Sequence, residues 1–174
     1  MASTEHLARL KDAIAARNMT GWNRWRQENQ YIPPDLSRAD LSGAILGGAN
    51  LTKVNLAGTD LTGAYLAAAD LTGAYLEGAD LTRAFLWVAN LAKADLGKAN
   101  LMEVNLTGAD LTSASLWVAN LMGAMLWGAN LREANLKGAN LTGAKELLQM
   151  QIDEANGNKD TKLPPNLRKP INWA

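Results

Sequence analysis

Leucine stands at every fifth position from Leu36 to Leu141, which gives 22 consecutive repeats. The residue two places before each leucine is small. It is alanine in every repeat except the four that carry Pro34, Val54, Thr59 or Val104. The residue directly before the leucine is usually Asp or Asn, so the repeat unit is A-(D/N)-L-x-x. A period as regular as this one governs the fold.

A period of five fits neither a helix nor a straight strand. On an α-helix five residues advance about 500°, so the leucines would spread around the helix. On a strand successive side chains alternate between two faces, so half of the leucines would face water. The remaining solution is a chain that turns one corner in each repeat and points every leucine at a common axis. The sequence therefore predicts an all-β solenoid of the β-helix type.

The residue before each leucine indicates how many sides the coil has. It departs from Asp or Asn only at positions whose numbers end in 5, namely Ile45, Tyr65, Tyr75, Phe85, Ser115 and Met125. A three-sided coil would spread these departures over all sides, whereas an even number of sides confines them to alternate sides. Two sides are too flat to enclose leucines, so we predict four sides with 20 residues per coil. The 22 repeats then make about 5.5 coils, with a height of roughly 26 Å.

The run ADLSGAILGGANLTKVNLAGTDLTGAYL resembles the pentapeptide-repeat proteins, and the resemblance extends from Asp35 to Gly143. It implies a right-handed quadrilateral β-helix with short helical caps. The flanking segments WNRWRQENQYIPPDLSRADL and TKLPPNLRKPINW are similar to segments of bacterial, and especially cyanobacterial, members. The resemblance is informative about fold more than about function.

The segment before the repeats, residues 1–33, is predicted to be a helical cap. A helix is expected from Thr4 to Arg17, and a second from an N-cap at Thr20 until the prolines at positions 33 and 34. The second helix carries Trp22 and Trp25. These two residues either cover the first coil or line a binding site.

The repeats occupy residues 34–143, and residues 144–174 are predicted to form a short helix and an extended tail that is long enough to run along the outside of the solenoid. The apolar residues of this segment are expected to face the last coil or to anchor the tail: Leu147, Leu148, Met150 and Ile152 in the helix, and Leu163, Leu167, Ile171 and Trp173 in the tail.

Composition excludes most kinds of chemistry. The chain has 17 basic and 17 acidic residues, so no nucleic-acid footprint is expected. It has no cysteine and one histidine, His6, which leaves no residues for a triad, a metal site or a cofactor. The side chains of the stacked Asp40, Asp60 and Asp80 are interpreted as structural, with hydrogen bonds to the backbone of the turns. No signal peptide or membrane span is expected. The sequence therefore predicts a bacterial cytoplasmic protein with no membrane partner.

One side of the predicted solenoid is apolar on its outer surface. It is the side of the core leucines Leu46, Leu66, Leu86, Leu106 and Leu126, and its candidate interaction residues are Ile45, Tyr65, Phe85, Trp87, Val88, Met125 and Trp127. The opposite side carries Tyr75, Trp117 and Val118, and a third carries Met102 and Met122. Outward aromatic side chains need cover. The cover is either the protein's own N-terminal segment or C-terminal tail, or an unknown protein partner or a second copy.

These features predict a non-catalytic scaffold for protein–protein interaction. The alternative is a DNA mimic that binds a topoisomerase such as gyrase, as the quinolone-resistance members of the family do. Charge argues against this alternative, because the repeats from Asp35 to Gly143 hold 10 acidic and 7 basic residues, far fewer acids than a mimic of DNA phosphates needs.

Overall fold

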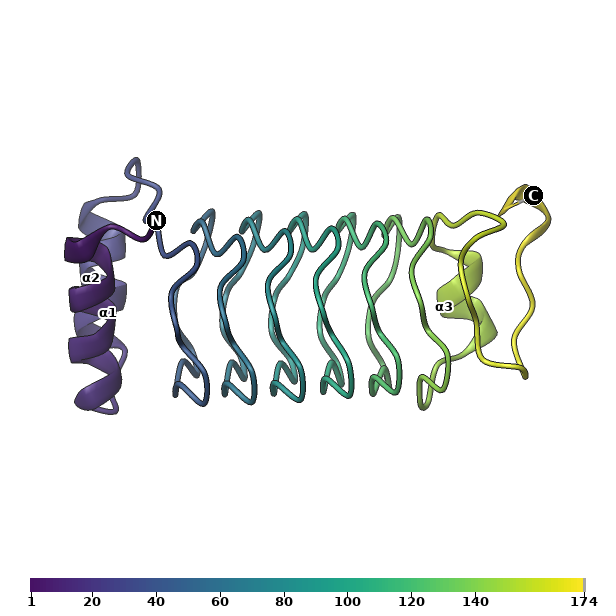
Figure 1. The fold of residues 1–174 in the computed structure, drawn as a ribbon, viewed down its shortest axis with the longest axis horizontal. Helices are drawn as coiled ribbons and strands as arrows, with labels where there is room; N and C mark the ends of the chain where they lie inside the picture. Colours follow the sequence, from purple (N-terminus) through teal and green to yellow (C-terminus); the bar gives the residue numbers. More distant parts are fainter. Residues whose placement is uncertain (174) are drawn as a thin grey trace.

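The structure, a computed structural model that describes residues 1–173, is a rod of stacked coils with a helical cap at one end (Figure 1). Two helices, α1 (Thr4–Ala15) and α2 (Thr20–Glu28), lie across the first coil. The short α3 (Gln149–Asp153) and the 3-10 turn η1 (Ile171–Trp173) lie at the far end. None of the helices in residues 1–173 has the length and apolar run that crossing a bilayer requires.

Each coil contains 20 residues, as the four-sided interpretation requires. Parallel bridges join residues 20 positions apart, for example Asp40 with Asp60 and Tyr65 with Phe85. In every repeat except that of Leu131, the leucine N–H bonds to the next coil, as that of Leu46 does to the carbonyl of Tyr65 at 2.7 Å. The bridges are isolated and extended strands are absent from the described residues, because the chain turns a corner after every side.

The leucines and the small residues fill the interior of the rod. All 22 leucines of the repeats are buried, and so are the alanines that alternate with them. The polar exception, Thr59, is also fully buried, and its hydroxyl donates to the carbonyl of Leu36 at 2.9 Å. The hydrogen bond removes the cost of burying that hydroxyl.

The second residue after each leucine forms the corner and has a positive φ. Glycine occupies this position in half of the repeats, as at Gly58 (φ 63°) and Gly108 (φ 65°). Only glycine adopts this conformation without steric cost, which explains the glycines of the repeat. Val88 (φ 51°) and Val118 (φ 56°) adopt it as well, although β-branched residues rarely do.

The N-terminal helices cap the first coil, as expected for a solenoid whose end would otherwise expose backbone. The first helix ends at Ala15, two residues before the predicted end. The second begins at Thr20 with Met19 as its N-cap, so the prediction of Thr20 as the N-cap was wrong. Trp22 is buried, and its Nε1 donates to the carbonyl of Asn50 at 2.8 Å. Trp22 is therefore part of the cap.

The C-terminal segment covers the last coil. The ladder continues past the leucine repeats, because Lys145, Asn156 and Lys162 form bridges to the coil below. Trp173 is buried against Gly157, and its Nε1 donates to the carbonyl of Ala155 at 3.3 Å.

Three of the expected apolar anchors in this segment are exposed, namely Leu148, Met150 and Ile171. Leu148 and Met150 leave the core because α3 is only five residues long and directs Gln151 and Ile152 inward. Ile171 lies in η1, whose buried residue is Trp173.

Candidate interaction face

The predicted apolar side exists as a continuous surface, which we call the aromatic face. Its central column is a bridged ladder that runs from Ile45 through Tyr65, Phe85 and Asn105 to Met125. The two corner residues after each leucine of this side border the column. The aromatic face therefore consists of Ile45, Gly47, Gly48, Tyr65, Ala67, Ala68, Phe85, Trp87, Val88, Asn105, Thr107, Gly108, Met125, Trp127 and Gly128.

The large side chains of the aromatic face reach water. Its four aromatic residues are 40–63% exposed, and Trp127 is the most exposed of them. Ile45 and Val88 are exposed to a similar degree, and Met125 is half-buried. All seven candidate residues thus lie on one side of the rod with their side chains accessible.

Neighbouring aromatic rings on this face contact one another. The ring centroids of Tyr65 and Phe85 are 6.4 Å apart, with the rings inclined by 39°. The ring of Tyr65 also lies over Gly47, where a Cβ atom would come within 3.1 Å of Cε1. Gly47 therefore gives Tyr65 the room to lie along the face.

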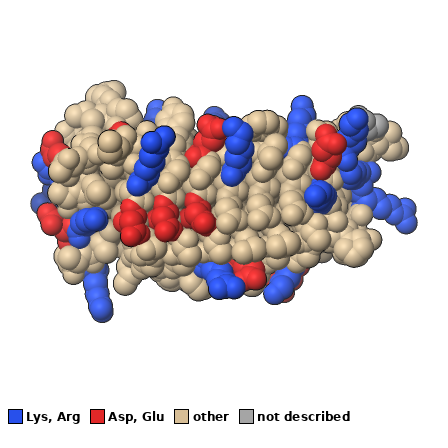
Figure 2. Space-filling model, in the orientation of Figure 1, with Lys and Arg blue, Asp and Glu red and all other residues tan. Residues whose placement is uncertain are grey.

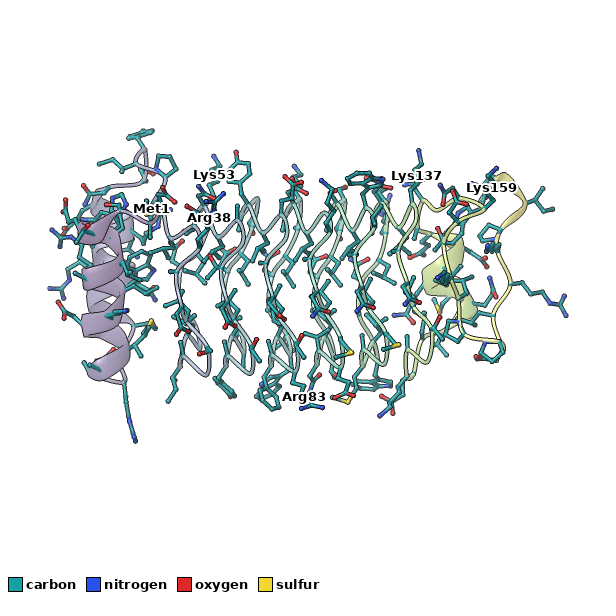
Figure 3. All side chains as sticks on the ribbon, in the orientation of Figure 1. Met1, Arg38, Lys53, Arg83, Lys137 and Lys159 are labelled. Atoms are coloured by element: carbon teal, nitrogen blue, oxygen red, sulfur yellow. The ribbon has the colours of Figure 1, made fainter. Side chains whose placement is uncertain are left out.

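The aromatic face carries no charged residue in its fifteen positions. The nearest ion pair, Arg83 with Glu103 at 2.7 Å, lies at the corner that precedes the face. Arg83 projects from the lower edge of the coils, opposite Arg38 and Lys137 on the upper edge (Figure 3). The hydrogen bond from Arg83 lowers the pKa of Glu103, and the carboxylate raises the pKa of Arg83. The two opposite charges at this corner are therefore paired with each other.

The chain's own termini leave the aromatic face uncovered. The N-terminal helices and the C-terminal tail lie at the two ends of the rod, and no segment of residues 1–173 runs along its side (Figure 1). The alternative in which the tail covers this side does not occur in the structure, because Trp173 packs at the end of the rod.

A third exposed tryptophan, Trp117, lies on another corner, in a second copy of the sequence LWVAN that also contains Trp87. Trp117 is 45% exposed, as is Trp87. Its ring, however, lies under the ammonium group of Lys98, which is 5.0 Å from the centroid, and Lys98 in turn pairs with Glu77 at 2.9 Å. This corner is therefore mixed in charge and smaller than the aromatic face.

The row of three aspartates forms a charged stripe on the neighbouring side of the rod (Figure 2). Each carboxylate accepts the N–H two residues later, and Asp40 also accepts the hydroxyl of Ser42 at 2.7 Å. These hydrogen bonds lower the pKa of Asp40. No group of three metal-ligating side chains occurs within residues 1–173. The row stabilises turns, as its sequence position predicted.

Met122, which the sequence assigned to a third side, lies on the corner that precedes the face and is exposed. One feature of the face was not identified from the sequence, namely the positive φ of Val88, which Val118 shares on the opposite side. A β-branched residue at a position that is otherwise often glycine was the available signal.

Comparison with known proteins identifies the repeats. The family model described as pentapeptide repeats (8 copies) matches four segments, residues 35–73, 69–108, 89–117 and 119–156. A search of curated proteins finds no match.

Similar solved structures include two cyanobacterial pentapeptide repeat proteins. HetL of Nostoc sp. strain PCC 7120, which is involved in heterocyst differentiation regulation, is 34% identical over 72% of this chain and 68% of its own, with a TM-score of 0.37. Rfr23 of Cyanothece 51142 is 28% identical over 81% of this chain and 97% of its own, with a TM-score of 0.36. The fluoroquinolone resistance protein QnrB1 is 19% identical over 79% of this chain and 80% of its own, with a TM-score of 0.38. With its repeats matched over more than half of its length, this chain belongs to the pentapeptide-repeat family.

Proposed function

We propose that this protein is a non-catalytic scaffold that binds a protein surface through the aromatic face. The observation that carries the proposal is that Tyr65, Phe85, Trp87 and Trp127 are exposed on one uncharged side that neither terminus covers. Exposed apolar surface of this extent is unfavourable in water and is typical of interaction sites.

The non-catalytic part of the proposal rests on residue types. The chain has one histidine and no cysteine. Nδ1 of His6 accepts the backbone N–H of Asp35 at 3.1 Å, so this nitrogen is engaged in holding the cap on the first coil. Histidine is the side chain most often used as a general base and cysteine is intrinsically a strong nucleophile, so the scarcity of these two residue types supports a non-catalytic role.

Binding energy at such a face is expected to concentrate in its tryptophans. Tryptophan is enriched among the residues that dominate protein interfaces, and truncation of one typically costs a few kcal/mol. Trp87 and Trp127 lie two coils apart on the same corner, a separation of roughly 10 Å. They are the side chains whose removal tests the proposal.

The test is affinity capture from a native lysate with the wild type, the double variant Trp87→Ala/Trp127→Ala and the control Trp117→Ala. The control removes a tryptophan of equal exposure from a different corner. We expect the wild type and the control to retain the same protein, and the double variant to lose it. If all three forms retain the same set of proteins, the aromatic face is not the binding site.

A further inference from the structure

We propose that the partner is a second copy of this chain, packed antiparallel with aromatic face against aromatic face. This inference rests on the proposed function and names the occupant of the same site. It comes from the order in which large and small residues follow one another along the face.

The corner column of the face has small residues near the N-terminal end and tryptophans further along. Reading one residue per coil, it runs Gly47, Ala67, Trp87, Thr107 and Trp127. The first is a glycine, and the ring of Tyr65 lies over it. The last is the most exposed tryptophan of the face. The residue without a side chain and the most exposed side chain thus lie at opposite ends of one column.

A two-fold axis brings these ends together if it lies between the two faces, perpendicular to the rod and level with the coil of Trp87. Such an axis reverses the column, so Trp127 of one copy lies over Gly47 of the second copy, two coils from the centre. Ala67 then lies opposite Thr107. Trp127 thus meets a glycine and Ala67 meets Thr107, whereas Trp87 at the centre meets its own symmetry mate, and the two-fold axis repeats each off-centre contact twice.

The same axis also reverses the central column. Reversal places Tyr65 opposite Asn105 and Ile45 opposite Met125, and it places Phe85 near its own symmetry mate. Ile45 and Met125 form an apolar pair at each edge, Tyr65 meets a shorter amide, and the two copies of Phe85 meet at the centre.

Charge favours a second copy as well. In a two-fold contact every charge on the axis meets the same charge on the other copy, which is unfavourable. The fifteen positions of the aromatic face hold no charge, whereas the acidic row on the neighbouring side would face its own carboxylates. The aromatic face is therefore suited to pair with itself.

The area of the face approaches what a stable dimer needs. At 150–250 Å² per aromatic side chain, the four half-exposed aromatics offer roughly 400 Å². Ile45 and Val88, together with Met122 on the preceding corner, are each close to half exposed and bring the apolar area to roughly 550 Å². Asn105, Thr107 and the glycines between them extend the surface towards the ~800 Å² that each partner of a standard interface buries.

The first test is the oligomeric state by light scattering at about 100 µM, a concentration at which a dimer of micromolar affinity is formed. We expect the wild type to be a dimer. Trp87→Asp places a carboxylate close to the axis and should give a monomer, whereas Trp117→Asp, at a position of equal exposure, should remain a dimer. Circular dichroism of both variants checks that the solenoid is intact.

The second test determines the orientation and uses the absence of native cysteine. Ile45→Cys and Met125→Cys are treated with a bis-maleimide that spans about 10 Å, close to the separation of packed sheets. In the antiparallel dimer, the two copies of position 45 are separated by roughly 19 Å along the rod. We therefore expect a cross-linked species from the mixture of the two variants, and none from either variant alone.

Each outcome decides between the two proposals. A monomeric wild type overturns the antiparallel dimer. If Trp87 and Trp127 are nevertheless needed to capture another protein, the proposed function stands with a different occupant. A cross-link from Ile45→Cys alone overturns the antiparallel order, and a dimer that only Trp117→Asp dissociates overturns the choice of face.

Discussion

The indole nitrogen of Trp22 donates a hydrogen bond of 2.8 Å to the carbonyl oxygen of Asn50, 28 residues further along the chain. This bond ties the N-terminal helices to the coils, together with the guanidinium of Arg26, which donates to the carbonyl of Thr52 at 2.7 Å. Backbone groups at the open end of the ladder are thereby covered. The cap is thus joined to the solenoid by specific polar contacts as well as by apolar packing.

Deletion of residues 1–30 is expected to preserve the coil but to increase self-association. The coil is held by its own ladder and leucines, whereas the uncovered first coil presents free backbone groups to other chains. Circular dichroism should be retained while light scattering shows larger species. Trp22→Phe, which keeps a six-membered aromatic ring and removes the pyrrole ring with its N–H, is the control and should lose roughly 1–3 kcal/mol without association. A truncated form that scatters as the wild type does would contradict this role of the cap.

Leu86→Ala is expected to lower the free energy of unfolding by roughly 2–5 kcal/mol, because it removes buried apolar volume and leaves a cavity. Lys93→Ala, on the exposed corner, should change it by no more than about 0.5 kcal/mol. Denaturant melts of the two variants measure the difference. Equal midpoints would mean that the leucines do not form the core.

Val88→Gly is expected to raise the free energy of unfolding by about 1 kcal/mol. A non-glycine residue in the left-handed region costs about 1–2 kcal/mol, and the greater unfolded-state entropy of glycine offsets part of the gain. Val104→Gly, at a buried position, should destabilise instead. Denaturant melts at a concentration where the protein is monomeric provide the comparison. An unchanged or lower midpoint for Val88→Gly would show that the positive φ of Val88 carries no strain.

Acid is expected to weaken the first coil through Asp35. The N–H and hydroxyl of Ser37 hold the pKa of Asp35 below its ordinary value of 3.8. A lowered pKa stabilises the fold above the ordinary value, and this contribution is lost as the pH falls from 3.8 through the folded pKa. Asp35→Asn keeps an oxygen acceptor and cannot titrate, so its melting temperature should fall less between pH 4 and pH 2. Parallel melting curves for both proteins over that range would refute the assignment.

The protein is expected to leave DNA gyrase unaffected at micromolar concentration, with or without a quinolone. A DNA mimic needs a long run of negative charge. Here the acidic row of three aspartates continues as Asn100, Asn120 and Asn140. Supercoiling assays measure the effect. An inhibition curve that a charge-reversing change of Asp60 abolishes would favour the topoisomerase-binding alternative.

The sequence by itself determined the coil. A leucine at every fifth position can be buried only if the chain turns a corner in each repeat, and the residues before the leucines indicated four sides. Because corners and sides alternate at fixed positions, the sequence also placed Tyr65, Phe85 and Trp87 on one side, where the structure has them. The right-handed sense of the coil, which the family resemblance implies, stays a prediction.

Only the tertiary structure decided whether the chain's own tail covers that side. The tail is long enough to lie along the rod, and its composition does not indicate where it packs. Trp173 instead fits against Gly157, which has no side chain to exclude the indole, so the tail remains at the end of the rod. The exposed aromatic face follows from this long-range contact. Such a contact depends on shape in three dimensions, and the local period of the repeats carries no information about it.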